Sequence, residues 1–341
     1  MRVCLTIDTE FSIGGAFAAP ARHPVGAQMV RCDVDGRSQG LDFMLDCFER
    51  NGIVTTFFIE TLQRHYFRDD PMRALAQRIA AAGHELQLHA HPCWAVFQHD
   101  DWPERVRREP RQDDFAGRDE SSTLELLRQS QSAFSDWGLA PAQVFRSASL
   151  QHDDNLYRAL AIVGIPYSSN IGLAIYDSGD PLYRLYCGRH LRHGVQECPI
   201  LTFTDWRWRQ PHLKTLSISG TSFAETRTLL EQARRAGMEL VVILTHPFEY
   251  VQSRGFDYRM LRRHGVNQRR LARLCAYLAA NRDRFQASGL AAAASLPLAP
   301  DRADNRLLRG APWQSVCRMA TQVIYDRYGH WALARQNAET A

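Results

Sequence analysis

Short runs of β-branched and aromatic residues alternate along the chain with longer segments whose apolar residues recur at helical spacing. The short runs predict buried strands at 3–7, 53–59, 85–88, 144–145, 165–168 and 240–244. The helical spacing predicts helices at 41–50, 71–83, 124–134, 155–163, 226–236 and 267–278. Such alternation is typical of an α/β fold made of parallel βα units, closed as a barrel or open as a doubly wound sheet.

Two internal stretches and the C-terminal region do not fit this alternation. We interpret residues 94–120 and 205–212 as long loops. An Ala- and Pro-rich linker then leads to residues 313–335, whose apolar side chains recur at helical spacing. We therefore predict a barrel over residues 1–290, followed over 291–341 by the linker and a C-terminal amphipathic helix. That helix could pack on the barrel, join two subunits of a homo-oligomer, or lie on a membrane surface.

Composition and charge exclude several classes of protein. A hydrophobic content of 45% excludes whole-chain disorder, and a net charge of +4 gives no strong field for nucleic acid. The eight cysteines contain no pair separated by two residues, which excludes a zinc ribbon. No apolar run is long enough for a transmembrane segment. The chain begins with a strand-like run rather than a signal peptide, and we expect a cytoplasmic protein with reduced thiols.

Four polar residues come at the ends of four separate predicted strands: Asp8, His89, Arg146 and His246. In parallel barrels the carboxyl ends of the strands meet at one face, and this face carries the chemistry. The pattern therefore favours the barrel and predicts a convergent site.

The segment from Gly83 to Pro92 contains three histidines. Because side chains alternate along a strand, His89 and His91 point to the same side and could hold one metal ion, whereas His84 points to the other side and is structural. The spacing of His84 and His89 excludes the helical zincin arrangement. Residues Asp8 and Glu10 share a face for the same reason as the histidine pair. One of these carboxylates could bind the metal while the other acts as general base, or both could simply cap a loop.

The residues quoted so far, together with Thr56-Phe57-Phe58-Ile59, occur in the order and strand contexts of a known family. The chain resembles the NodB-type polysaccharide deacetylases of carbohydrate esterase family four over roughly residues 1–290, and most closely the WalW-like lipopolysaccharide and exopolysaccharide biosynthesis branch. The resemblance implies a distorted (β/α) barrel that binds a divalent metal, with Zn²⁺ as the expected ion. It also implies hydrolysis of acetyl groups on a carbohydrate substrate.

The resemblance assigns a role to each matching residue. Asp8 corresponds to the general base, Arg146 to the arginine that orients the base, and His246 to the general acid. His89 and His91 correspond to the histidine ligands of the metal. Physically, an aspartate beside an arginine stays ionised and a histidine can titrate near neutrality.

The chain departs from the family pattern at three places. Thr9 stands where the family has its second aspartate, so Glu10 must serve as the carboxylate ligand. The family's histidines are four residues apart, a spacing that would pair His89 with Cys93; we prefer His91, because a proline follows it as in the family. The residues after Arg146 lack the usual proline and glycine.

Three tryptophans are candidate substrate-binding residues, Trp94, Trp206 and Trp208, because indole rings can stack on sugars. We predict a metal-dependent hydrolase that removes an N-acetyl or similar acyl group from a sugar or sugar-linked precursor of a surface polysaccharide. The alternatives are hydrolysis of a non-sugar C–N amide bond, and a barrel that has lost catalysis and acts as a binding or assembly protein.

Overall fold

The computed structural model describes residues 1–207, 209–297 and 305–340, with side chains described except at 207, 326 and 328–340. Its strands are β1 (Arg2–Thr9), β2 (Asp33–Val34), β3 (Arg37–Ser38), β4 (Thr56–Glu60), β5 (Glu85–Ala90), β6 (Val144–Ser147), β7 (Tyr167–Ser168), β8 (His190–Arg192), β9 (Val195–Glu197), β10 (Thr202–Arg207), β11 (Pro211–Thr215), β12 (Leu240–Thr245), β13 (Val251–Ser253), β14 (Leu261–Arg263), β15 (Gln286–Ala287) and β16 (Leu308–Arg309).

Its α-helices are α1 (Ala27–Arg31), α2 (Leu41–Asn51), α3 (Pro71–Ala81), α4 (Trp102–Arg108), α5 (Glu120–Asp136), α6 (Asp154–Ile162), α7 (Phe223–Arg235), α8 (Gly265–Ala280), α9 (Leu290–Ala294) and α10 (Pro312–Thr340). Short 3₁₀ turns follow several strands, among them Pro92–Gln98 after β5 and Pro247–Tyr250 after β12. Each predicted helix is present, with bounds that differ by a few residues.

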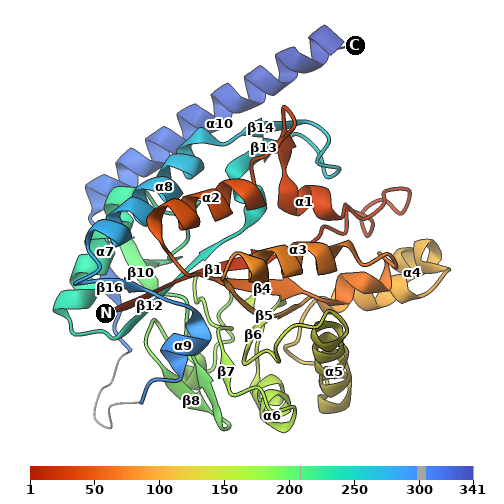
Figure 1. Ribbon diagram of the computed structural model, residues 1–341, viewed down its shortest axis with the longest axis horizontal. Coiled ribbons are helices and arrows are strands. Elements are labelled where there is room, and N and C mark those ends of the chain that lie inside the picture. Colours follow the sequence, from red (N-terminus) through yellow and green to blue (C-terminus); the bar gives the residue numbers. More distant parts are fainter. Residues whose placement is uncertain (208, 298–304, 341) are drawn as a thin grey trace.

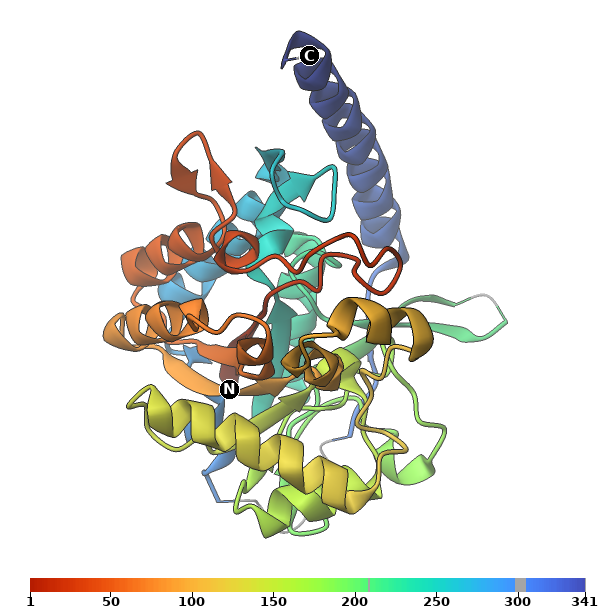
Figure 2. The same cartoon turned by 90° about the vertical axis from the view of Figure 1, so that its right-hand side faces the viewer.

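The main sheet has the strand order β12-β1-β4-β5-β6-β7-β9-β8, with β15 beside β1, and its pairings are parallel except at β8. Helices cover its outer side (Figures 1 and 2). On β12, isolated parallel bridges from Ile200 and Ser217 occupy the edge that faces away from β1. The curled parallel sheet matches the predicted distorted barrel, which is therefore confirmed.

The sheet is curled strongly enough to bring distant strands together. Strands β1 and β6 are separated by β4 and β5, so a flat sheet would hold them about 14 Å apart. Yet Nη1 of Arg146 on β6 lies 2.6 Å from Oδ1 of Asp8 on β1. The curvature thus brings side chains of β1 and β6 into direct contact near the carboxyl ends of the strands.

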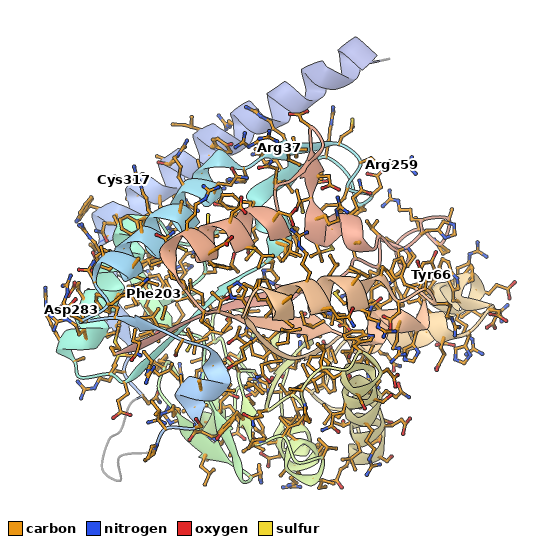
Figure 3. The ribbon with its side chains drawn as sticks, in the orientation of Figure 1. Arg37, Tyr66, Phe203, Arg259, Asp283 and Cys317 are labelled. Carbon is orange, nitrogen blue, oxygen red and sulfur yellow. The ribbon has the colours of Figure 1, made fainter. Side chains whose placement is uncertain are left out.

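The core lies between this sheet and its helices, and side chains fill the space between the layers (Figure 3). β1 is buried along almost its whole length, as the apolar run at 3–7 predicts. Capping explains several helix starts: the side chain of Ser222 accepts from the backbone of Glu225 in a capping box at α7.

Two predicted loops contain regular structure. Residues 94–120 include the helix α4, whose proline in the first turn suits a helix start, so the prediction of a long loop there was wrong. Residues 205–207 and 211–212 belong to the strands β10 and β11, which form a three-stranded sheet with β16. The prediction of a loop was therefore wrong for these residues, because a bulky aromatic residue beside a charged one, as at Trp206 and Arg207, also suits a strand.

The C-terminal helix is present as α10 and is longer than predicted. Helix α9 spans the proposed boundary at residue 290 and buries its alanines against the sheet, so the division into two units stays a prediction. Within the described part of the chain, no helix combines the length and apolar character that a membrane crossing requires.

Candidate metal and catalytic site

Six of the predicted site residues meet at the carboxyl ends of the strands. β1 carries Asp8 and leads into Glu10, and β5 carries His89 and leads into His91. β6 carries Arg146, and His246 follows β12. Neighbouring strands align them, because His89 pairs in register with Arg146. The period-two argument therefore predicted correctly which side chains share this face.

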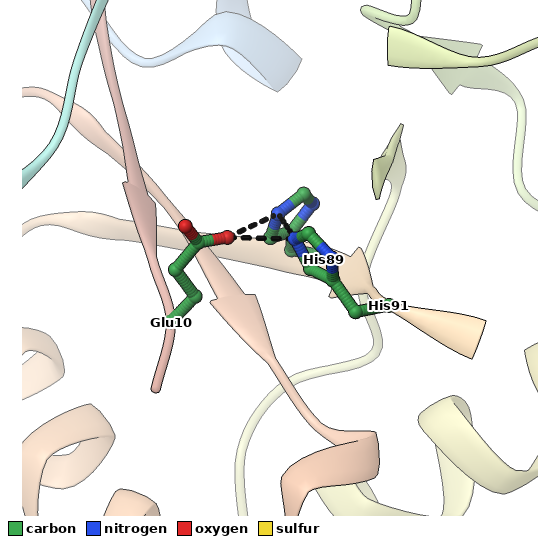
Figure 4. Close-up of side chains that lie close together, drawn as sticks. All are labelled: Glu10, His89 and His91. Atoms are coloured by element: carbon green, nitrogen blue, oxygen red, sulfur yellow. Dashed lines mark hydrogen bonds and ion pairs between the residues drawn. The ribbon is translucent and has the colours of Figure 1, made fainter. Parts of the chain in front are cut away.

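Three side chains form a cluster of candidate metal ligands (Figure 4). Oε2 of Glu10 lies 2.7 Å from Nε2 of His91 and 3.2 Å from Nε2 of His89. The two Nε2 atoms are 3.1 Å apart. One carboxylate oxygen and two imidazole nitrogens thus point at a common centre.

The outer nitrogens of both rings are held by acceptors. Nδ1 of His89 donates to the backbone carbonyl of Arg146 at 2.8 Å. Nδ1 of His91 lies 3.0 Å from the carboxylate of Asp113, which also forms an ion pair with Arg111. Donation from Nδ1 leaves a lone pair on each Nε2 of a neutral ring, and such partners are typical of metal-bound histidines.

The electrostatics of this cluster favour a positive charge at its centre. Burial alone would raise the pKa of Glu10, yet His91 and His89 bring it well below its usual range. Burial would lower the pKa of His91, yet the carboxylates of Asp113 and Glu10 raise it well above its usual range. A pair of imidazoles and a carboxylate suit Zn²⁺ and leave a coordination position open. The residues therefore fit the predicted divalent metal.

Cys93 belongs to a second group, with His91 and Asp113, whose donor atoms also lie close together. The Asp113 carboxylate of this group is already paired with the Arg111 guanidinium, whose positive charge opposes a cation there. The cluster of Glu10, His89 and His91 is therefore the better candidate, although the choice is a proposal.

Asp8 is held by a buried arginine. The Arg146 guanidinium is fully buried, donates to Asp8 at 2.6 Å and to the Thr6 hydroxyl at 3.0 Å, and lies over the ring of Phe58. Its remaining nitrogens donate to the backbone and hydroxyl oxygens of Ser169. This arrangement fixes the position of the carboxylate and compensates its charge.

His246 lies on the other side of Asp8, with 3.9 Å between its Nε2 and Oδ2 of Asp8. Its Nδ1 lies 3.2 Å from Oε1 of Glu249. Burial disfavours the charged ring, but the hydrogen bond and charge of Glu249, with Asp8 and Glu10 nearby, raise the pKa of His246 to about 9. The ring is therefore protonated at neutral pH and can donate a proton.

Sequence reasoning missed three carboxylates of this site: Asp113, Glu249 and Glu60. Asp113 comes from the stretch interpreted as a loop, where no pattern marks it, whereas Glu249 follows His246 by three residues, a spacing that could have been noticed. Glu60 ends β4 opposite His89, and burial raises the pKa of Glu60 to about 7. Its Oε2 has no hydrogen-bond partner among the described residues.

Trp94 and Trp206, two of the predicted substrate-binding tryptophans, make their ring contacts away from the candidate metal ligands. Trp94 is only 1% exposed and packs against Phe67 and Phe97, so it offers no face to a sugar. Trp206 is exposed on β10 and stacks on His212. Trp208 lies outside the described residues. His84, predicted to be structural, packs against Phe57 and contacts Thr55.

Comparisons with solved structures identify proteins of similar fold. A protein of Mycobacterium smegmatis, assigned as a polysaccharide deacetylase, is 16% identical; the match covers 88% of this chain and 93% of that chain, with a TM-score of 0.52. A family 4 carbohydrate esterase from Streptomyces lividans, solved with acetate, is 14% identical, with 88% and 98% coverage and a TM-score of 0.41.

A third similar structure is a carbohydrate esterase family 4 pseudoenzyme from Bacillus anthracis, 10% identical, with 86% coverage of this chain, 65% of that chain and a TM-score of 0.42. No protein-family model and no curated protein matches the chain. At these identities the likeness to the mycobacterial protein establishes the fold alone. The activity has to be argued from the site.

Proposed function

We propose that this chain is a metal-dependent deacetylase of the carbohydrate esterase family four type, which hydrolyses an N-acetyl or similar acyl group on a sugar. The observation that carries the proposal is the convergence of a candidate ligand set with an arginine-held aspartate and a protonated histidine. Amide hydrolysis needs a base on one side of the scissile carbon and an acid at the leaving nitrogen. Asp8 and His246 supply those two groups.

Glu10, His89 and His91 would hold the divalent ion, with Zn²⁺ as the proposed metal. When bound, such an ion supplies Lewis acidity that polarises the acyl carbonyl and makes water a stronger nucleophile. The Asp113 carboxylate orients the ring of His91 from behind. The backbone of Arg146 does the same for His89.

The chain's own groups account for the proton transfers. Asp8, positioned by its ion pair with Arg146, accepts a proton from the attacking water as the new C–O bond forms. His246, kept protonated by Glu249, gives its proton to the sugar nitrogen as the C–N bond breaks. The products are free acetate and the amino sugar. For an O-acetyl substrate the same proton would go to the leaving oxygen.

We further propose that the substrate is a nucleotide-linked or lipid-linked precursor of a surface polysaccharide, as in the WalW-like branch that the sequence resembles. The order of the strand-end motifs supports the polysaccharide deacetylase type. A sugar-free amide substrate and a non-catalytic barrel are outcomes of the test below.

The test measures acetate release from N-acetylated sugar donors by the purified chain, before and after chelation and after addition of Zn²⁺. We expect release that needs the ion and that falls on the order of a hundredfold or more in Asp8→Asn and His246→Gln. His193→Asn is a matched control, because His193 is exposed in the β8–β9 turn. Unchanged release in Asp8→Asn would contradict the mechanism. Absence of release from every sugar donor would favour either a sugar-free amide substrate or the non-catalytic barrel.

A further inference from the structure

Helix α10 packs on the body of the protein through its polar face. Its inward side chains form hydrogen bonds to α7, α8 and their surroundings: Gln314 to Thr228, Ser315 to Glu225, Arg318 to Glu225 and Asp205, Gln322 to Arg270, and Tyr325 to Gly265. Gln314 and Ser315 are buried, and the other three inward residues are partly buried. An ordinary surface helix buries its apolar face instead.

The apolar side chains of the same helix face solvent. The exposed set, which we call the apolar stripe, consists of Trp313, Val316, Met319, Val323 and Ile324. With about 3.6 residues per turn these positions cover one arc of the helix, opposite to the arc that packs inward. Ile324, for example, is 70% exposed. The amphipathic pattern of the sequence is thus turned outward.

The position of α10 leaves this stripe accessible. The helix runs along the edge of the molecule, and its C-terminal end extends past the rest of the protein in both views (Figures 1 and 2). Cys317, labelled in Figure 3, is the exposed member of the chain's free cysteines and lies beside the stripe. A contiguous exposed apolar face on a soluble protein marks an interaction surface.

A positively charged groove adjoins the stripe. Its volume is about 300 Å³, and α8 contributes Arg269, Arg270 and Arg273 to its lining. Trp313 of the stripe also lines it, so the two features are continuous. Its lining, within the described part of the chain, includes no carboxylate residue. Arg270 is buried and donates to the backbone carbonyl of Ser219, so we call the exposed Arg269 and Arg273 and their surroundings the basic groove.

We propose that the apolar stripe and the basic groove together dock this protein on an anionic lipid surface, with α10 lying in the plane of the interface. Apolar side chains, tryptophan among them, enter the boundary between headgroups and acyl chains, while arginines pair with anionic headgroups. This proposal is independent of the proposed catalytic activity.

Charge distinguishes this occupant from a second copy of the chain. A twofold dimer formed through this face would bury the same patch on both copies, so it would bring both basic grooves to one interface. Two arginine-rich surfaces repel each other, whereas an anionic surface attracts both.

The test is co-sedimentation of the full chain with vesicles of phosphatidylcholine, with and without phosphatidylglycerol, at low and high salt. We expect binding to the anionic vesicles only, weakened by salt. Val323→Gln with Ile324→Gln should reduce the partition of the protein into vesicles on the order of tenfold or more, because two apolar side chains that enter the lipid are lost. Arg269→Gln with Arg273→Gln should reduce it too, and should remove most of the salt dependence.

Control variants carry changes of the same kind elsewhere. Ile162→Gln on α6 replaces a comparably exposed apolar residue, and Arg107→Gln with Arg108→Gln on α4 removes two exposed arginines. Both should bind vesicles like the parent chain. Sedimentation velocity runs beside the binding assay. Failure of the parent chain to bind anionic vesicles, or unchanged binding by the stripe variant, would overturn the proposal. So would a parent dimer that becomes a monomer in the stripe variant, because the stripe would then be a subunit interface.

Discussion

At the scale of single residues, several of the proposed catalytic and ligating side chains are held by a second polar residue. Arg146 holds Asp8, Glu249 contacts His246, and Asp113 contacts His91. These partners orient the groups that we propose to face the substrate, and the two carboxylates also raise the pKa of their histidines. Substituting a partner should therefore change the pH dependence of activity or the metal affinity. Removing the catalytic or ligating side chain itself should abolish activity or metal binding altogether.

Glu249→Gln should shift the pH dependence of deacetylation. The Glu249 carboxylate is the largest of the contributions that raise the pKa of His246, which lies at about 9, with Asp8 and Glu10 contributing less. A general acid must be protonated, so activity falls as the pH rises through its pKa. Removing the charge lowers that pKa, and the alkaline limb of kcat/KM should move to lower pH, on the order of one unit.

The measurement is the pH profile of kcat/KM for acetate release. The control is Glu125→Gln, which removes an exposed carboxylate on α5 and should leave the limb in place. An alkaline limb that does not move in Glu249→Gln would show that His246 is not the group titrating there.

Asp113→Asn should weaken metal binding. The Asp113 carboxylate lies 3.0 Å from Nδ1 of His91 and increases the basicity of that ring. Loss of such a partner typically lowers metal affinity about 10- to 100-fold. Zinc titration of the metal-free chain against a competing chelator measures this directly. Asp114→Asn, at the exposed neighbouring position, should bind as the parent does. Equal affinity of the two variants would contradict a supporting function for Asp113.

The sequence predicts residues best where a periodic element carries them. His89 and His91 follow from strand alternation, and so do Asp8 and Glu10, because the backbone conformation fixes the direction of each side chain. Asp113 could not be found in this way, because it lies between elements and reaches His91 only through the path of the 92–119 segment. Trp94 shows that position along the chain does not predict burial. Its place just after a strand predicts where the backbone lies, but not that the ring packs inward.

At the scale of elements, local chemistry determines where helices begin, and this can be tested at α5. The side chain of Asp119 accepts from the backbone of Ser122 at 2.9 Å and from the hydroxyls of Ser121 and Ser122. These bonds lower the pKa of Asp119, so the cap is charged at neutral pH. The predicted helix at 124–134 began four residues late, because that prediction followed apolar spacing and did not use the cap.

Asp119→Ala should lower the free energy of unfolding by about 1 kcal/mol, because an N-terminal amide of α5 loses its acceptor. Urea denaturation measures the change, with an unchanged m-value expected. Asp119→Ser should recover most of the loss, since serine caps comparably. Equal stability of the alanine and parent chains would mean that this cap adds nothing to the folded state.

At the scale of the whole molecule, the sequence predicts the parts but not how the C-terminal helix attaches. Its apolar spacing favours packing through an apolar face, yet Ser315 and Arg318 face the body and Ile324 faces solvent. The reason lies in α7 and β10, which present the buried carboxylates Glu225 and Asp205 to the helix. Ion pairs between residues far apart in the sequence do not change the local spacing of apolar residues, so the sequence pattern could not predict this attachment.

Arg318→Ala should destabilise the entire protein rather than release α10 alone. Arg318 lies 2.8 Å from Asp205 and 3.1 Å from Glu225, which are 1% and 0% exposed. Truncation leaves buried carboxylates without their cation, which costs about 3 kcal/mol or more. Urea denaturation followed by far-UV circular dichroism should show one transition, shifted to lower urea. Arg327→Ala, exposed on the same helix, should change the free energy of unfolding by less than about 0.5 kcal/mol. A separate early transition in Arg318→Ala would instead mean that α10 unfolds independently, because the ion pairs then hold the helix but do not couple it to the barrel.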